Sequence, residues 1–467
     1  MERIKGGEAA GKDDEMKRRV WWMAAAAWAA ACGLAVAGMS AERAAEAKAA
    51  AAKGAAWLAA QQAEDGHWGS PETPALTALA FWALQRTDAE GYAEAIAKGR
   101  DFVLRHVQPD GSIWKRPEPG TLGGGLANYN TAVCLSALHS LGDKDLTLTM
   151  QRARTYLAGT QYRNEGLFRG GIGYSPDEVA PHADLSNSHM VFEAMRLTQD
   201  VEDLRAAGEP KADLDWDAAL AFLAQVQNLA SVNTNSWIST EADDQGGFIY
   251  RPMTQGAMEK TKRGKTDKKG REEAAGLEGG DIRGADMRQP PDIEFPETKL
   301  NPPLRLASPG GEEPRERLER GENPVPPLHR PGAGEAVKAH PYGSMTYAGI
   351  LSLIYAKVDA KDERVVAAKD WAMRHWTLTE NPGMGQEGLY YFYNTLSKCM
   401  AAMGEETVAM EDGDEVRWQD DLADRLMDLQ SDDGFWVNEN NRWWDADPVL
   451  VTSYSLLALS SAMEGNP

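Results

Sequence analysis

Apolar residues recur at helical spacing along most of the chain, in runs that alternate with polar turns. The clearest case is residues 422–459. There LADRLMDLQ has helical periodicity, SDDGFW interrupts it, and LVTSYSLLAL begins a second, more apolar helix. This pattern predicts one helix, an Asp-Gly turn followed by an aromatic residue, and a return helix.

The same unit recurs five times before residue 422. First helices are expected within 55–62, 101–108, 155–161, 220–228 and 368–376. Return helices are expected within 74–84, 129–138, 185–195, 343–353 and 393–403. The return helices align without gaps on one hydroxyl-bearing residue, which is Thr77, Thr131, Ser188, Thr346, Thr395 and Thr452 in the six copies.

A single helix pair cannot bury both of its faces, so its stability must come from neighbouring pairs. Six pairs closed in a ring leave no exposed end. The sequence therefore predicts an all-α fold, an (α/α)6 toroid with six apolar return helices inside and six more polar helices outside. A glycine in each turn allows the left-handed backbone that reverses the chain, and the aromatic residue after it is expected to pack between pairs.

The first 45 residues are expected to be an export signal or a single membrane anchor. Lys17, Arg18 and Arg19 precede an uncharged hydrophobic segment, Val20–Met39, of roughly twenty residues, the length that spans a bilayer as a helix. Ala35-Val36-Ala37, near the end of this segment, has the A-x-A form of a cleavage site. The basic flank predicts a chain exported across the cytoplasmic membrane, either periplasmic or membrane-anchored. A soluble Ala-rich helix is the alternative.

A long insertion is expected to divide the toroid into 46–254 and 339–467. Residues 255–338 hold eleven of the 24 prolines, one Phe and no Trp, Tyr or Cys. Such a composition cannot bury a core, so a disordered insertion in the fourth turn is predicted. Its basic stretch at 260–271 fits a solvated linker better than a contact with anionic lipid.

Composition excludes some classes of function. A net charge of −22 and a pI near 4.9 argue against nucleic-acid binding, which requires clustered basic residues. The three cysteines, Cys32, Cys134 and Cys399, suggest no disulfide framework, and the last two are expected to fill the core.

The turns resemble the QW-type repeats of the terpenoid cyclase and protein prenyltransferase toroid superfamily. More narrowly, segments 170–189, 246–252, 342–356 and 381–395 resemble bacterial exported proteins described as prenyltransferase and squalene oxidase repeat proteins, or squalene cyclase-like proteins. The resemblance implies the toroid fold and a polyprenyl or triterpenoid lipid as ligand or substrate.

The catalytic motifs of that superfamily are absent. Squalene and hopene cyclases protonate an alkene with a D-x-D-D motif, and the nearest string here is the E-x-D-D of residues 241–244, which is typical of a turn. Protein prenyltransferases hold zinc with an Asp-x-Cys pair, and neither Cys134 nor Cys399 has an Asp two residues before it. No metal and no other cofactor are therefore predicted.

Polar and aromatic residues near the starts of the return helices are the candidate site, because those positions should face the mouth of the ring. The candidate catalytic residues are Asp184, His189 and Asp447. The candidate substrate-binding residues are Asn130, Asn187, Tyr347, Tyr390, Tyr393, Asn394 and Trp443. Helix capping is the alternative explanation for the Asp and Asn residues.

Three functions remain open. In the first, the ring binds or cyclises an isoprenoid or triterpenoid lipid, with aromatic faces that stabilise positive charge and Asp184 or Asp447 as proton donor. In the second, it is a carbohydrate-active toroid, either a polysaccharide lyase with His189 or Tyr393 as base and Asn187 on a uronate, or a glycosidase with paired carboxylates. The third is a non-catalytic, protein-binding scaffold whose partner is unknown.

Overall fold

The computed structural model describes residues 39–116, 126–175, 182–253, 338–409 and 415–464. The chain divides into two units, one made of residues 1–252 and 339–467 and the other of residues 253–338. The second unit, which contains the predicted insertion, lies outside the described residues apart from its two end residues. The predicted export segment lies outside them as far as residue 38. No helix in the described ranges has the length and apolar character needed to cross a bilayer.

The described chain is mostly helical, as predicted for an all-α fold, and its main helices alternate between outer and inner positions. The outer helices are α2 (Ala41–Ala60), α4 (Ala93–Leu104), α6 (Thr147–Thr160), α8 (Trp216–Val226), α12 (Glu363–Arg374) and α14 (Trp418–Leu429). The inner helices are α3 (Pro74–Asp88), α5 (Ala127–Ser140), α7 (Leu185–Leu197), α11 (Gly343–Tyr355), α13 (Leu389–Met403) and α15 (Pro448–Met463).

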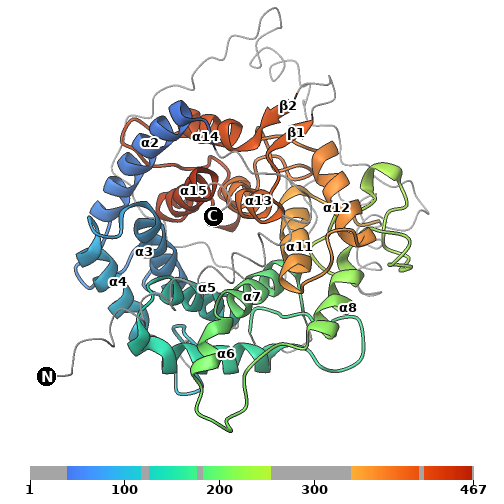
Figure 1. Cartoon of the computed structure of the whole chain (residues 1–467), viewed down its shortest axis with the longest axis horizontal. Helices are drawn as coiled ribbons and strands as arrows, with labels where there is room; N and C mark the ends of the chain where they lie inside the picture. Colours follow the sequence, from blue (N-terminus) through green and yellow to red (C-terminus); the bar gives the residue numbers. More distant parts are fainter. Residues whose placement is uncertain (1–38, 117–125, 176–181, 254–337, 410–414, 465–467) are drawn as a thin grey trace, which may run out of the picture. The chain divides into compact units, whose positions relative to one another are not determined.

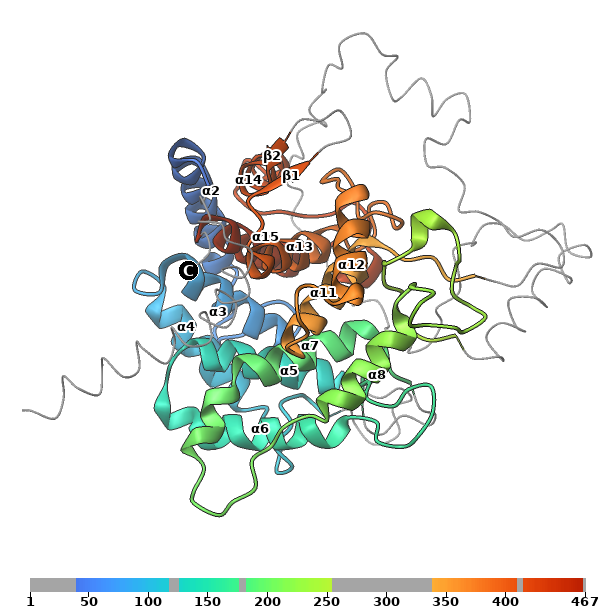
Figure 2. The ribbon, with the colours of Figure 1, turned by 45° about the vertical axis from the view of Figure 1, so that its right-hand side comes forward.

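The inner helices pack side by side in a closed cycle. Each packs against the next in chain order, and α15 packs against both α13 and α3 (Figure 1). Each outer helix lies against the inner helices, so that α6, α8 and α12 follow one another outside α7 and α11 (Figures 1 and 2).

Hydrophobicity explains this order, because a helix that is apolar all round must be buried, whereas an amphipathic helix covers a core with one face. In α15 every residue from Val449 to Ser460 is buried, whereas α12 buries only Val365, Ala368, Trp371 and Ala372.

Short elements complete the fold within the described ranges. The 3-10 helices are η1 (Lys144–Leu146), η2 (Gln199–Leu204), η3 (Ala242–Asp244) and η5 (Arg442–Trp444). Two short antiparallel strands, β1 (Thr407–Ala409) and β2 (Glu415–Arg417), precede α14.

The aligned hydroxyl of the inner helices fastens each turn to its own pair. In five pairs it accepts a hydrogen bond from the backbone N–H two residues after the turn glycine. These bonds join Trp68 to Thr77 (3.0 Å), Ile113 to Thr131 (2.9 Å), Ile172 to Ser188 (2.9 Å), Phe248 to Thr346 (3.1 Å) and Trp436 to Thr452 (3.0 Å).

The fifth pair differs. The Thr395 hydroxyl donates to the carbonyl of Tyr391 (2.8 Å), and no turn N–H reaches it within the described residues. Asn381 holds this turn instead. Its Oδ1 accepts from the N–H of Ser344 (2.9 Å), and its Nδ2 donates to the carbonyl of Glu387 (3.0 Å). The sequence alignment therefore matches Thr395 in position but not in role.

A glutamine before the turn joins consecutive pairs. In four pairs its side-chain amide donates both to its own turn glycine and to a carbonyl of the next outer helix or its cap. Gln227, for example, donates to Gly246 (3.1 Å) and to Arg364 of α12 (2.8 Å). Gln430 donates to Gly434 (2.7 Å) and to Ala50 of α2 (2.9 Å), and so ties the last pair to the first.

The turn glycine makes this close approach possible. Gly246 has a φ of 97°, and a Cβ built there would lie 1.9 Å from the carbonyl oxygen of Ala367 in α12. Gly434 has a φ of 101°, and its Cβ would lie 2.8 Å from the carbonyl oxygen of Lys53 in α2. Both the left-handed backbone and the contact with the next helix therefore exclude a side chain.

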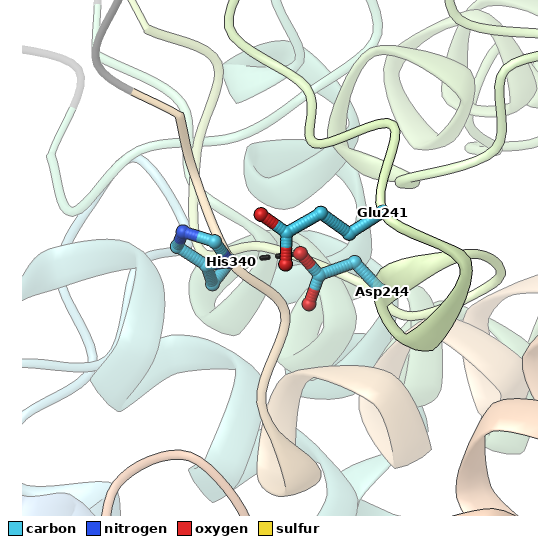
Figure 3. Close-up of side chains that lie close together, drawn as sticks. All are labelled: Glu241, Asp244 and His340. Atoms are coloured by element: carbon cyan, nitrogen blue, oxygen red, sulfur yellow. Dashed lines mark hydrogen bonds and ion pairs between the residues drawn. The ribbon is translucent and has the colours of Figure 1, made fainter. Parts of the chain in front are cut away.

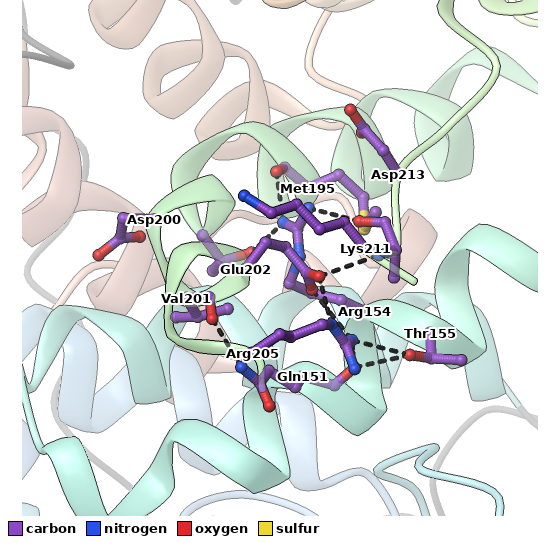
Figure 4. A network of polar contacts seen from close by, with 12 residues as sticks. Gln151, Arg154, Thr155, Met195, Asp200, Val201, Glu202, Arg205, Lys211 and Asp213 are labelled. Carbon is purple, nitrogen blue, oxygen red and sulfur yellow. Dashed lines mark hydrogen bonds and ion pairs between the residues drawn. The ribbon is translucent and has the colours of Figure 1, made fainter. Parts of the chain in front are cut away.

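A buried ion pair holds the third pair together (Figure 4). Arg154 of α6 is 1 % exposed, and its Nε donates to Glu202 of η2 (2.8 Å). The same guanidinium donates to the carbonyls of Met195 (2.6 Å) and Ala212 (2.9 Å). Glu202 also accepts from Arg205 and from the backbone of Ala212. This buried charge is satisfied from several elements at once, as a buried pair requires.

Replacing Gly246 by Ala tests the approach between consecutive pairs. Gly208 is the matched control, because it has a similar φ of 91° and nothing within 4 Å of a built Cβ. We expect Gly208→Ala to lower the free energy of unfolding by about 1–2 kcal/mol, because of the left-handed backbone alone. Gly246→Ala should cost about 1–3 kcal/mol more because of the clash. Urea unfolding measures both, and equal losses would show that the contact with α12 is unimportant.

Replacing Glu202 by Gln tests the buried network. The change keeps the size of the side chain but leaves the Arg154 guanidinium buried without its counter-ion. We expect a loss of about 3–5 kcal/mol in the free energy of unfolding. Asp203→Asn, which removes an exposed pair with Lys211, should change it by less than about 1 kcal/mol. Similar small losses for both variants would contradict the structural role of the network.

Candidate functional site

The inner helices enclose a small cavity. Five of them, α3, α5, α7, α13 and α15, line it, and its volume is about 10 Å³. This is room for about one water molecule. The aromatic part of the wall consists of Trp82, Tyr129 and Tyr454, and the polar part consists of Ser136, Glu193, Asn394 and Lys398.

An ion pair between two inner helices crosses this cavity. Lys398 Nζ on α13 donates to Glu193 Oε1 on α7 at 2.8 Å and lies 5.1 Å from the centre of the Trp82 ring on α3. Burial by itself would raise the pKa of Glu193, but the neighbouring Lys398 ammonium and the Tyr355 hydroxyl lower it below its usual value. The pair is therefore charged, and the Trp82 face adds a cation–π contact.

His189 lies one turn before Glu193 on α7, behind the ion pair. It is 2 % exposed, its Nδ1 is 3.4 Å from Ser352 Oγ, and its ring stacks on Tyr355 with centroids 6.0 Å apart. Burial lowers the pKa of His189 to about 4, and Lys398 acts in the same direction. The imidazole is therefore neutral at neutral pH.

Asn394 is the predicted site residue that lines the cavity. It is 3 % exposed, and its Oδ1 has no hydrogen-bond partner. An orphaned acceptor costs free energy unless a donor reaches it, so a water or a ligand hydroxyl fits here. The wall also carries hydroxyls, because Tyr129 and Tyr454 line it and hydrogen-bond to each other at 3.2 Å.

The two predicted catalytic carboxylates cap helices. Asp184 is fully buried and precedes α7, where its carboxylate accepts from the N–H of Asn187 (2.8 Å) and from the Asn187 amide (2.9 Å). Asp447 precedes α15 and accepts from the N–H groups of Val449 (2.8 Å) and Leu450 (3.3 Å). Burial raises the pKa of Asp447 in spite of these two donors. Asn187 keeps one orphaned buried oxygen.

Other polar residues cap the inner helix of the preceding pair. Asn130 Oδ1 accepts from the N–H of Ala75 at the start of α3 (2.9 Å). Asp445 accepts from the N–H of Leu389 at the start of α13 (3.0 Å) and from the Asn438 amide (2.7 Å). These side chains satisfy the free N–H groups of helix starts, which the sequence offered as the alternative to substrate binding.

The predicted tyrosines lie within the wall of the ring. Tyr347 packs on Phe392 with ring centres 5.8 Å apart, and Tyr390 meets Tyr393 edge-on at 5.7 Å. The Tyr393 hydroxyl donates to the carbonyl of Leu378. None of these three tyrosines lines the cavity.

Trp443 lies in η5 and is 37 % exposed. Its φ of 56° is left-handed, and Arg442 lies 4.5 Å from its ring centre.

The sequence interpretation missed the two central charges, Glu193 and Lys398. A signal existed for Lys398, which is the one charged residue of the return helix 389–403, whereas Glu193 shares the helix 185–197 with Arg196. The catalytic and binding roles given to the predicted residues stay predictions. Of the predicted site residues, Asn394 lines the cavity, and His189 lies one helical turn before Glu193, which also lines it.

Capacity for a metal lies elsewhere. Within the described ranges, the group of three His and carboxylate side chains close enough to share an ion is Glu241, Asp244 and His340, at the fourth turn. Cys134 and Cys399 are buried and unpaired, and burial raises the pKa of both thiols. Those thiols fill the core.

No protein-family model matches the chain, and no curated protein matches its sequence. Similar solved structures are those of a type II terpene cyclase from Scytonema, MstE. Its complex with the product merosterolic acid A has a TM-score of 0.45 and 11 % identity, and covers 91 % of this chain and 99 % of that one. The complex with the substrate geranylgeranyl dihydroxybenzoate has a TM-score of 0.44 and 10 % identity, and covers 92 % of this chain and 99 % of that one. The apo form has a TM-score of 0.44 and 11 % identity, and covers 90 % of this chain and 99 % of that one. A likeness this distant does not define a function.

Asp445 gives the site a testable pH dependence. It is 2 % exposed, and burial raises its pKa from 3.8 to about 7, although the Asn438 amide and the backbone donors oppose the shift. The stability that this carboxyl contributes is complete below its unfolded pKa of 3.8 and is lost as the pH rises through 7. As the pH rises from 5 to 8, we expect the free energy of unfolding of the wild type to fall by on the order of 2 kcal/mol relative to that of Asp445→Asn.

Urea unfolding at several pH values measures this difference. Asp433→Asn, in an exposed turn of the same pair, is the control and should track the wild type. A pH-independent difference between wild type and Asp445→Asn would show that this carboxyl is ionised throughout.

Proposed function

We propose that the chain is an (α/α)6 toroid of the terpenoid cyclase type that binds an isoprenoid or triterpenoid lipid at the centre of its ring. The observation that carries the proposal is the composition of the cavity wall. Trp82, Tyr129 and Tyr454 present aromatic surface, and the charges of Glu193 and Lys398 neutralise each other. Such a wall favours an apolar ligand with a small polar group.

The size of the cavity implies that binding requires movement. Ligand pockets are typically about 300–1,000 Å³, whereas this cavity is about 10 Å³. The hydrogen bond between Tyr129 and Tyr454 joins α5 to α15 across it. A lipid must therefore select a conformation in which these side chains separate, and its affinity is reduced by the cost of that opening.

Binding is better supported than cyclisation. Asp447 accepts two backbone N–H groups as a helix cap, Asp184 accepts one such N–H and the Asn187 side-chain amide, and Glu193 is held by Lys398. An acid that protonates an alkene must face the ligand in its protonated form. In this arrangement the carboxylates are committed to the fold. Export, expected from residues 1–45, is part of the proposal and rests on sequence alone.

A second candidate function is a scaffold for a basic protein. An open groove of about 360 Å³ lies beside α14, lined by Asp421, Asp424 and Asp428 together with Trp376 and one cation, Arg425. Asp424 is paired with Arg43 at 3.0 Å, which leaves the groove with excess negative charge from Asp421 and Asp428. These carboxylates follow helical spacing on one face of α14. The groove and the net charge of −22 favour a positively charged partner.

Two tryptophans of the first pair provide a matched test of lipid binding. Trp82 lines the cavity, whereas Trp57 packs on Phe435 away from it. We expect the full chain to bind tritiated geranylgeraniol more tightly than hexadecanol of the same concentration. Trp82→Leu should weaken that binding about tenfold, which corresponds to about 1.4 kcal/mol. Trp57→Leu removes a similar aromatic surface but does not touch the cavity wall, so it should leave the binding within about twofold.

The result that would contradict the proposal is equal retention of the two alcohols, or equal effects of the two substitutions. Retention of basic proteins that depends on Asp421 and Asp424, without retained lipid, would favour the scaffold.

A further inference from the structure

Three metal-ligating side chains converge at the fourth turn. Glu241 and Asp244 lie at η3, and His340 lies just before α11 (Figure 3). His340 Nδ1 is 2.8 Å from Asp244 Oδ2, and one ligand atom from each of the three residues lies within 4.8 Å of the others. This spacing suits a single ion held between an imidazole and two carboxylates.

The backbone that carries these side chains is fixed from both sides. Ala339 donates to the carbonyl of Trp237 (2.8 Å), and the Asn228 amide donates to the carbonyl of Ala339 (3.2 Å). Gln245 holds the turn through the carbonyls of Ser239 (2.9 Å) and Glu241 (3.3 Å). The backbone positions of the three residues are therefore set before any ion binds, and side-chain rotation brings ligand atoms that lie within 4.8 Å of one another to coordination distance.

The local charge favours a cation. Two carboxylates face one imidazole, and the Nε2 of the next histidine, His375, is 3.3 Å from Asp243 Oδ2. The His340–Asp244 pair neutralises at most one of the two carboxylates. A mixed nitrogen and oxygen donor set is typical of transition-metal ions such as Zn²⁺ or Mn²⁺, whereas Ca²⁺ and Mg²⁺ prefer oxygen alone.

We propose that Glu241, Asp244 and His340 form a binding site for a divalent transition-metal ion, for which Zn²⁺ is the best fit, with water in the remaining position. The site is independent of the proposed lipid cavity. Asp244 and His340 are 96 positions apart in sequence (340 − 244). An ion that joins them closes a long loop, so its binding stabilises the fourth pair. Without an ion, the His340–Asp244 contact is an ordinary ion pair.

Metal titration of the full chain tests the site. After treatment with EDTA and dialysis, we expect one equivalent of Zn²⁺ to bind, and Co²⁺ to give the absorption bands of a site with nitrogen and oxygen ligands. His340→Ala and Asp244→Asn should each weaken Zn²⁺ binding more than about 100-fold, since even changes behind the ligands typically cost 10–100-fold. His375→Ala is the matched control and should stay within about threefold.

Glu241→Gln guards against loss of fold, because Glu241 is exposed and its substitution should leave the metal-free melting temperature unchanged. We expect it to weaken Zn²⁺ binding about tenfold and to reduce the rise in melting temperature that Zn²⁺ causes in the wild type. The proposal is overturned if the wild type binds neither Zn²⁺ nor Co²⁺ at a metal concentration of about 100 µM, which is roughly one hundred times a dissociation constant of ~1 µM. It is also overturned if the ligand variants bind as tightly as the wild type.

Discussion

The contact of each turn with the next helix pair is the interaction on which the rest of the structure depends. Gln227 and Gln430 each donate from one amide to their own turn and to the following outer helix. The glycine beside them allows the two backbones to approach. A single pair has too little buried surface to fold alone, so these contacts convert six weak units into one closed cycle. The bond from Gln430 to Ala50 closes it without a free end.

The same principle explains the polar residues near the starts of the inner helices. The free N–H groups at those starts are buried and need acceptors. Asn130, Asn381 and Asp445 supply them from the next pair, and Asp184 and Asp447 supply them within their own pair. Polar residues that the sequence suggested as catalytic or substrate-binding thereby serve as caps of the inner helices. What remains at the centre is aromatic surface, the Glu193–Lys398 pair and the orphaned acceptor of Asn394, which is chemistry for holding a ligand.

The fourth turn differs from the others because its carboxylates lie beside histidines. Its E-x-D-D string resembles a catalytic motif only in composition, because Asp243 faces His375 and Asp244 faces His340 at the surface. Ile238 pairs with Ala339 at this turn, so segments that are far apart in the sequence meet there. These carboxylates are not among the residues that line the central cavity, and two of them belong to the ion site proposed above.

The sequence alone determined the helical units, because hydrophobic periodicity, turn glycines and the repeated hydroxyl are local features. The hydroxyls of Thr77 and Thr452 were found by alignment, and the structure gives both the same bond to a turn. Only the tertiary structure decided which side chains face the centre. Tyr393 and Tyr391 are two residues apart on α13, yet the first is buried in the wall and the second approaches Tyr454. A rotation of one helix by a fraction of a turn exchanges such neighbours, and that rotation is fixed by packing against adjacent pairs.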